Sequence, residues 1–319
     1  MMPSILAADI GATNSRFAHF EGEGSESLRL VNSVWLSSQG ATSFSELLEG
    51  LVSSDLGLDH NQADLICLAA AGPVQGESYC QPPHIAWDID LGRDLGGDTP
   101  SLLINDFVAQ AWACLSPVAQ AAQEVLPGQA DPQAAKAVIG AGSNLGHAAL
   151  APDGRGGWVP VASEGGHAAF AFFGPEEAAY QEFLGQERGD PYAIADTVVS
   201  GKGLSYLYQF FTGRKLEPAQ VGQALDSHPP TLEWMARFYG RACRQWALQV
   251  VALGGLYIAG GLAVKLPSLV RHPAFGREFR LADPTNRILG GIPVSLITDE
   301  NSGLWGAAAA ALERLGPRR

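Results

Sequence analysis

Near its start the chain runs Ser4-Ile5-Leu6-Ala7-Ala8-Asp9-Ile10-Gly11-Ala12-Thr13-Asn14, an apolar stretch that leads into a turn of small residues. The short apolar part, Ser4 to Ile10, predicts a buried strand, and the alternating stretch Ser15 to Phe20 predicts a second strand that returns from the turn. Small residues let a backbone approach an anion, and the N–H groups of such a turn can point at phosphate oxygens. The turn is therefore a candidate phosphate loop, although an ordinary hairpin with an acidic strand end has the same pattern.

The same pattern returns in the middle of the chain. Ala137 to Ala141 predicts a strand, Gly142-Ser143-Asn144 a turn, and Leu145 to Ala151 a returning strand. Two such units indicate an internal duplication, although the match is short. The turn lacks the G-K-[ST] ending of a P-loop. The stretch before it, Gln120 to Lys136, is polar and rich in alanine, and we expect a connection near a domain boundary there.

The rest of the chain alternates between short apolar runs and helical patterns. Strands alternating with helices are typical of the α/β class. We expect further strands at residues 64–70, 101–104, 256–259 and 294–298, and helices at residues 43–51, 106–115, 175–186, 204–211, 218–225, 231–253 and 303–315.

Composition and charge limit the possible functions. The 319 residues allow one large domain or two ordinary ones, and the net charge of -13 argues against a nucleic-acid partner, whose phosphates require Lys and Arg. We expect no membrane span and no signal peptide, because no apolar run is long enough and no basic region precedes one at the N-terminus. The four cysteines form no C-x-x-C pair, which favours reduced, buried thiols in a cytoplasmic protein.

Three more stretches carry candidate chemistry. Asn105-Asp106-Phe107 places a carboxylate after a buried strand, where by itself it would be interpreted as a helix N-cap. In Ser163-Glu164-Gly165-Gly166-His167 a carboxylate and an imidazole flank two glycines, a pairing that suits a polyol but also fits a solvent-facing turn. Ile258-Ala259-Gly260-Gly261-Leu262 suits close packing against a flat ring or a phosphate, or a plain strand-to-helix turn. Asp9, at the end of the first strand, could hold Mg²⁺ directly or through water.

In their order along the chain, these stretches resemble the bacterial glucokinase family, over nearly the whole length. The resemblance also includes Val199-Ser200-Gly201-Lys202-Gly203-Leu204 and ends with Asp299-Glu300-Asn301-Ser302-Gly303-Leu304-Trp305-Gly306. It implies the sugar kinase, Hsp70 and actin superfamily, with two α/β domains that have duplicated ribonuclease-H-like (actin-like ATPase) cores and a cleft between them. The expected domains are 1–108 plus 302–319, a small α/β domain, and 109–301, a large one.

The resemblance also implies a role for each matching residue. Asp106 matches the catalytic base, and Asn105, Glu164 and His167 match residues that hydrogen-bond the sugar hydroxyls. Asp196 falls where the family usually has a sugar-binding Glu. The implied ATP-binding residues are Ala8, Asp9, Ile10, Gly11, Ala12, Thr13, Asn14, Gly142, Ser143, Gly260 and Gly261, with Asp9 also the candidate Mg²⁺ ligand.

The activity implied is phosphorylation of the primary hydroxyl of a hexose by ATP and Mg²⁺, most simply glucose to glucose 6-phosphate, in the cytoplasm, with a homodimer as a candidate assembly. Departures from the family pattern leave two alternatives open: a catalytically weakened sugar-binding or regulatory protein, and a kinase for a different hexose. Ala12 and Asn144 replace glycines of the two turns, and Pro82-Pro83 fall where the family tends to carry a sugar-contacting Thr-Asn. Asp196 is one methylene shorter than the usual Glu.

The two turn substitutions yield a prediction about nucleotide affinity. Both stand where the backbone approaches phosphate, so the Ala12→Gly, Asn144→Gly double variant should have a lower KM for ATP than the unsubstituted protein. Steady-state kinetics at saturating sugar would measure it. An unchanged or higher KM would mean that these side chains do not weaken ATP binding.

Overall fold

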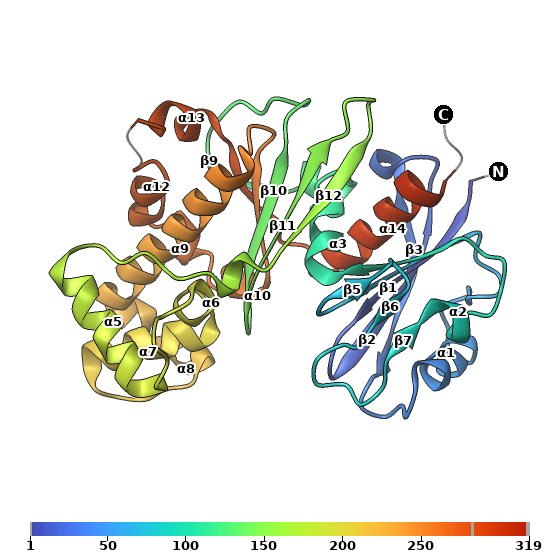
Figure 1. The fold of residues 1–319 in the computed structure, drawn as a ribbon, viewed down its shortest axis with the longest axis horizontal. Helices are drawn as coiled ribbons and strands as arrows, with labels where there is room; N and C mark the ends of the chain where they lie inside the picture. The colour runs from blue at the N-terminus through green and yellow to red at the C-terminus, as the bar shows by residue number, and fades with distance from the viewer. Residues whose placement is uncertain (1, 282–283, 317–319) are drawn as a thin grey trace. The chain divides into compact units, whose positions relative to one another are not determined.

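The computed structural model describes residues 2–281 and 284–316, which fold as two compact units (Figure 1). One unit comprises Met1–Ala121, Asp153–Ala162 and Asp299–Arg319, and the other Ala122–Pro152 and Ser163–Thr298. The domain limit expected between residues 108 and 109 falls inside a helix, and the expected limits stay a prediction. No described helix combines the length and the apolar character needed to cross a membrane.

The first unit is built on a five-stranded sheet in the order β3-β2-β1-β4-β8. These strands are β3 (Arg29–Ser37), β2 (Asn14–Glu21), β1 (Ser4–Ile10), β4 (Leu65–Ala70) and β8 (Ser101–Asn105). The hairpin β1–β2 is antiparallel, whereas β4 pairs in parallel with both β1 and β8. The carboxyl ends of β1, β4 and β8 therefore lie at one edge of the sheet, where Ile10 aligns with Ala70 and Ala70 with Asn105.

The second sheet repeats this order with one strand added, as β12-β11-β10-β13-β14-β9. Its strands are β12 (Trp158–Ser163), β11 (Leu145–Pro152), β10 (Lys136–Ala141), β13 (Leu256–Ala259), β14 (Val294–Leu296) and β9 (Gln123–Leu126). The hairpin β10–β11 is antiparallel, and β13 pairs in parallel with both β10 and β14, as in the first sheet. The internal duplication predicted from the two similar hairpins is thereby confirmed, as is the duplicated core that the family resemblance implies.

The added strand corrects one prediction. The stretch Gln120 to Lys136 was expected to be a connection, yet it contains β9, which pairs antiparallel with β14. β9 has four residues and none is fully buried, so it lacks the apolar run by which a buried strand is recognised.

Six helices of the first unit pack around its sheet among the described residues. They are α1 (Phe44–Val52), α2 (Leu91–Asp94), α3 (Asp106–Ala113), α4 (Pro117–Gln120), α14 (Ser302–Leu315) and the short η1 (Ser25–Ser27). α1 is capped by Ser43, whose Oγ accepts from the Glu46 N–H at 3.1 Å. α14 packs against α3 so closely that a Cβ on Gly306 would lie 1.7 Å from the Ala109 carbonyl oxygen.

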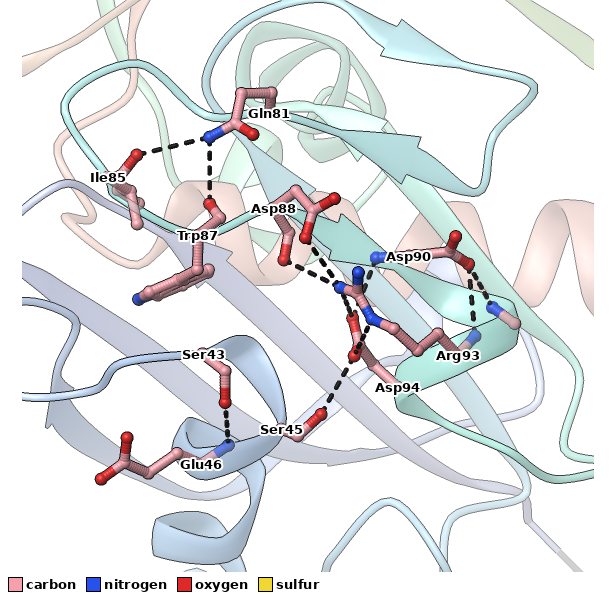
Figure 2. Close-up of polar contacts among 11 residues, drawn as sticks. Ser43, Ser45, Glu46, Gln81, Ile85, Trp87, Asp88, Asp90, Arg93 and Asp94 are labelled. Atoms are coloured by element: carbon pink, nitrogen blue, oxygen red, sulfur yellow. Dashed lines mark hydrogen bonds and ion pairs between the residues drawn. The ribbon is translucent and has the colours of Figure 1, made fainter.

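A small antiparallel sheet beside α1 is fixed by side-chain hydrogen bonds. It consists of β5 (Val74–Gln75), β6 (Tyr79–Cys80) and β7 (Ile89–Asp90). Figure 2 shows Arg93 between Asp88 and Asp94, with N–O distances of 2.9 and 2.8 Å, while Asp94 also accepts from Ser45 of α1 at 3.0 Å. The loop before β7 is held by the Gln81 amide, which donates to the carbonyl oxygens of Ile85 and Trp87.

Helices in the second unit surround α9, its longest described helix. They are α5 (Gly174–Arg188), α6 (Ala195–Val198), α7 (Gly201–Thr212), α8 (Pro218–Ala224), α9 (Pro229–Val250), α10 (Gly261–Lys265), α11 (Ser268–Arg271), α12 (Pro273–Phe279), α13 (Asn286–Gly291) and the short η2 (Gly165–His167) and η3 (Leu225–Ser227). Arg241 of α9 is buried and bonds to Glu177 of α5 at 3.0 Å and to Glu278 of α12 at 2.8 Å. This ion-pair network sets the relative positions of three helices, and its net stabilisation is small because burying charges is costly.

The α3–α14 contact gives a prediction about stability. A Cβ at residue 306 would meet backbone, which cannot rotate away, so Gly306→Ala should destabilise the protein by about 1–3 kcal/mol, the usual range for overpacking. Gly50→Ala is the matched control, because Gly50 is an exposed α1 residue whose nearest contact would be at 3.9 Å. That change should stabilise by about 0.5–1 kcal/mol, since alanine favours a helix. Urea denaturation would compare the two, and equal stability of both variants would contradict the packing argument.

Candidate active site

The first unit brings its candidate residues together at one sheet edge. Asp9 is the penultimate residue of β1, Asn105 is the last of β8, and Asp106 is the first of α3. β4 lies between these strands and joins them in parallel, so the acidic end of β1 and the Asn-Asp pair after β8 share that edge.

Local hydrogen bonds orient the Asn-Asp pair. The cap interpreted for Asp106 belongs instead to Asn105, whose Oδ1 accepts from the N–H groups of Phe107 and Val108 at 2.9 and 3.3 Å. A cap residue must have extended backbone, and Asn105 has it as the end of β8. Asp106 is thus within the first turn, where its Oδ1 also accepts from Phe107 at 2.9 Å. The Asn105 amide donates to the Gly72 carbonyl at 3.1 Å.

Asp106 has the electrostatic character of an acid–base group. Burial raises the pKa of its carboxyl to about 6, the negative charge of Asp9 adds to the rise, and the N–H of Phe107 opposes it. A pKa near the working pH is the most effective for proton transfer, and such shifts are enriched at functional sites. At neutral pH Asp106 is mostly an ionised base.

Asp9 has a partner that the sequence analysis missed. Its Oδ2 lies 2.6 Å from Nη2 of Arg16, which also donates to the Glu300 carbonyl and stacks over Trp35 at 5.0 Å. The signal was present in the sequence, because a tight hairpin pairs residues at equal distances from its turn, and Asp9 aligns with Arg16. The ion pair fixes the carboxylate orientation while leaving oxygen available for a hard cation.

The first glycine turn has the form of an anion cradle. A Cβ on Gly11 would lie 2.7 Å from the Asn14 carbonyl oxygen, so the turn requires glycine there. The amides of Ala12 and Thr13 donate to no described residue, which leaves them able to bind an anion. Ala8 and Ile10 are buried strand residues, so a nucleotide could contact only their backbone.

The second glycine turn is similar. Gly142 would carry a Cβ into open space, and the amides of Ser143 and Asn144 donate to no described residue. Gly260 has φ +86°, and a Cβ there would lie 2.7 Å from the Ala141 carbonyl, so the end of β13 lies directly against the start of this turn. Gly261 follows with open space around it. The second unit therefore brings the turn and the glycine pair together.

The loop at residues 163–167 contacts the first residues of β11. It is named the acceptor loop because Glu164 and His167 match residues that bind the acceptor sugar in the family that the chain resembles. Gly166 packs so closely that a Cβ would lie 2.1 Å from the Leu145 carbonyl oxygen. Glu164 and His167 flank Gly166, with Oε2 of Glu164 3.7 Å from Nε2 of His167. Their side chains are 71% and 65% exposed, respectively, so both are accessible to a ligand. Asp196 accepts a 2.5 Å hydrogen bond from the Leu145 N–H, which engages one of its oxygens in the fold.

No group of three or more His, Cys, Asp and Glu side chains in metal-binding geometry occurs among the described residues. Asp9 stays a predicted Mg²⁺ ligand, and phosphate and water commonly supply the remaining oxygens for that ion.

Residues 6–314 match the family model described as glucokinase. The glucokinase of Pseudomonas paraeruginosa (strain DSM 24068 / PA7) is 33% identical to the chain, over 97% of the chain and 93% of that protein. The chain belongs to the glucokinase family. It is therefore a sugar kinase, a phosphotransferase with an alcohol group as acceptor, and the resemblance stated from its motifs is confirmed.

Solved structures of glucokinases have the same two-domain fold. The crystal structure of glucokinase from an Antarctic psychrotroph has a TM-score of 0.87 and 27% identity, over 98% of this chain and 99% of that one. The glucokinase of Streptomyces griseus in complex with glucose and AMPPNP has a TM-score of 0.62 and 16% identity, over 97% and 99%. The second likeness supports the actin-like ATPase fold alone.

His147 on β11 is a further buried polar residue near the acceptor loop. It is 5% exposed, and burial lowers the pKa of its imidazole to about 4 from the ordinary value of 6.5. The unfolded chain therefore binds a proton more readily than the folded chain between these two values.

His147 should make the protein acid-sensitive. Above pH 6.5 the imidazole is neutral in both states and has no effect, whereas stability should fall as the pH drops from 6.5, by about 3 kcal/mol at pH 4. His147→Leu should flatten this part of the pH dependence, as measured by urea denaturation between pH 7 and 4. A variant with an unchanged pH slope would show that His147 is not the titrating group.

Proposed function

We propose that the protein transfers the γ-phosphoryl group of ATP to the primary hydroxyl of glucose, with Asp106 as general base. The observation that carries the proposal is the carboxylate of Asp106, with its raised pKa, at the same sheet edge as the first anion-binding turn and Asp9. Family membership supports the phosphotransferase chemistry and does not favour a weakened binding protein.

Asp106 accepts the proton of the hydroxyl as its oxygen attacks the γ-phosphorus. An O–P bond to the sugar forms, the bond to the β-phosphate oxygen breaks, and ADP leaves. The open amides of the two turns bind phosphate oxygens and offset their charge. Mg²⁺, bound with the nucleotide at Asp9, would neutralise further charge on the transferred group.

Sugar recognition is assigned to Asn105, Glu164 and His167. The Asn105 cap oxygen is engaged by α3 and one amide hydrogen donates to the Gly72 carbonyl, so the second amide hydrogen is the group that can bond a hydroxyl. Glu164 and His167 have exposed side chains, and the Glu164 carboxylate makes no capping hydrogen bond to η2 that would compete with a sugar hydroxyl. Asp196 would contribute through its second oxygen, since the first bonds Leu145. Gly260 and Gly261 are the proposed nucleoside-binding pair.

We place the reaction in the cytoplasm because the four cysteines are buried free thiols, as is typical of a reducing compartment. A homodimer stays a prediction that light scattering would test.

ADP release measured by a coupled assay over a panel of hexoses tests the proposed function. Glucose should give the highest kcat/KM, with dependence on Mg²⁺ and ATP. Preference for another hexose would correct the substrate, and the absence of ADP release with every sugar would overturn the proposal.

The proposed role of Asp106 predicts the effect of its replacement on kcat and the pH dependence of kcat/KM. Asp106→Ala should lower kcat by about 10²–10⁴-fold, the usual loss for a general base. In the unsubstituted protein, kcat/KM should fall about tenfold per pH unit below pH 6, because only the carboxylate accepts a proton. Asp98→Asn, at an exposed acid of the same unit, is the control and should change neither. A near-normal kcat for folded Asp106→Ala would refute the assignment.

Glu164 predicts selective loss of sugar affinity. Glu164→Gln keeps the shape but removes the charge that strengthens bonds from hydroxyls. Calorimetry should therefore show weaker glucose binding and nearly unchanged ADP binding. Equal loss for both ligands would instead point to a role of Glu164 in folding.

A further inference from the structure

His147 has a ring nitrogen that the fold leaves without a partner. Nδ1 is fully buried and has no hydrogen-bond partner among the described residues. Leaving a buried polar atom unpaired costs about 1–3 kcal/mol, so such an atom calls for an explanation. Nothing in the strand requires a polar residue here, because the next residues of β11, Ala148 and Ala149, are apolar and buried. An aliphatic side chain in place of His147 would leave no polar atom unpaired.

The unpaired nitrogen faces the acceptor loop. An ideal Cβ on Gly165 would lie 3.5 Å from Nδ1 and 3.7 Å from Cε1 of His147, and 3.0 Å from Oγ of Ser163. Nδ1 and the Ser163 hydroxyl therefore flank the same small space, which exists because residue 165 has no side chain. Ser163 Oγ already accepts the Gly165 N–H at 3.0 Å, so its own proton is available for an acceptor.

The imidazole is held in place from the opposite side. Trp246 of α9 packs against it, with ring centroids 5.3 Å apart at 64°, and the Trp246 Nε1–H donates to the Ala148 carbonyl at 3.2 Å. Two rigid elements, β11 and α9, thus fix the ring, whereas the loop above it is a single short turn. Because the ring is held on both elements, formation of a contact with Nδ1 would require an adjustment of the loop.

We propose that His147 is a positioning residue for the acceptor loop: its Nδ1 accepts the Ser163 hydroxyl when sugar binds, and this contact fixes Glu164 and His167. Burial without a charged neighbour keeps the imidazole neutral at physiological pH, as an acceptor at Nδ1 must be. The inference rests on the proposed function, because it takes the loop to be the sugar-binding one.

Two replacements separate the hydrogen bond from packing. An Asn side chain places a polar atom near the position of Nδ1, so His147→Asn can keep the acceptor, whereas His147→Leu fills the space without one. We expect His147→Leu to raise the Kd of glucose about 2–10-fold, as for one lost hydrogen bond, with His147→Asn closer to the unsubstituted protein. The Kd of ADP, measured by the same calorimetry, should change in neither.

A double-mutant cycle with Ser163→Ala tests the partner. Each single change should weaken glucose binding, and Ser163→Ala should add almost nothing in the His147→Leu background, because the shared contact is already lost. Additive losses would overturn the proposed pair. Equal losses for the Asn and Leu variants, or equal losses of glucose and ADP binding, would reduce His147 to a packing residue.

Hydrogen exchange of the 163–168 amides, measured with and without saturating glucose, gives a second readout. With glucose bound, exchange there should be faster in His147→Leu than in His147→Asn, whereas without sugar the two variants should exchange alike. Glucose binding by the unsubstituted protein is measured first. Its absence for every hexose would refute the proposed function, whereas bound glucose with equal exchange rates in the two variants would refute the positioning role alone.

Discussion

β1 pairs in parallel with β4, and β4 in parallel with β8, so three strands of the first sheet end at one edge. Parallel strands need crossover connections, and these return the chain to the opposite edge before each new strand begins. Groups that follow β1 and β8 are thus brought together although nearly a hundred residues of sequence separate them. In the second unit the parallel pair β10–β13 does the same for the glycine turn after β10 and for Gly260.

Charge at the first edge follows from this geometry. Two carboxylates, Asp9 and Asp106, interact across it, and the repulsion contributes to the raised pKa of Asp106. Arg16 pairs with Asp9 alone among the carboxylates of the described edge, so the two acids have different surroundings: Asp9 is in an ion pair, whereas Asp106 is buried and its pKa is raised to about 6. That difference is the basis for proposing Asp9 as the cation ligand and Asp106 as the general base.

Much of this arrangement could be predicted from the sequence, because its signals are local. The hairpin β1–β2, the buried strand β4, the capped helix α1 and the repeated hairpin β10–β11 all follow from apolar runs and turn residues. The cap at Asn105 was misassigned to Asp106, since two adjacent side chains can both cap and only the backbone angles decide between them. The position of Nδ1 of His147 beneath Gly165 depends on tertiary packing, and periodicity carries no information about it.

The departures from the family pattern do not damage the two turns. Neither Ala12 nor Asn144 adopts a positive φ, so each residue fits its turn without the strain that only glycine would avoid. The phosphate contacts proposed there are made by backbone amides, which every residue except proline has, and the amides of both residues donate to no described residue. Their side chains can therefore weaken nucleotide binding only by crowding it.

Pro83 differs from these residues because it lies against Gly72, with its Cδ 3.2 Å from the position that a Cβ on Gly72 would take. The Gly72 carbonyl in turn accepts a hydrogen bond from the Asn105 amide. Pro83 therefore bears on the position of Asn105, the residue before Asp106, and not on the two turns.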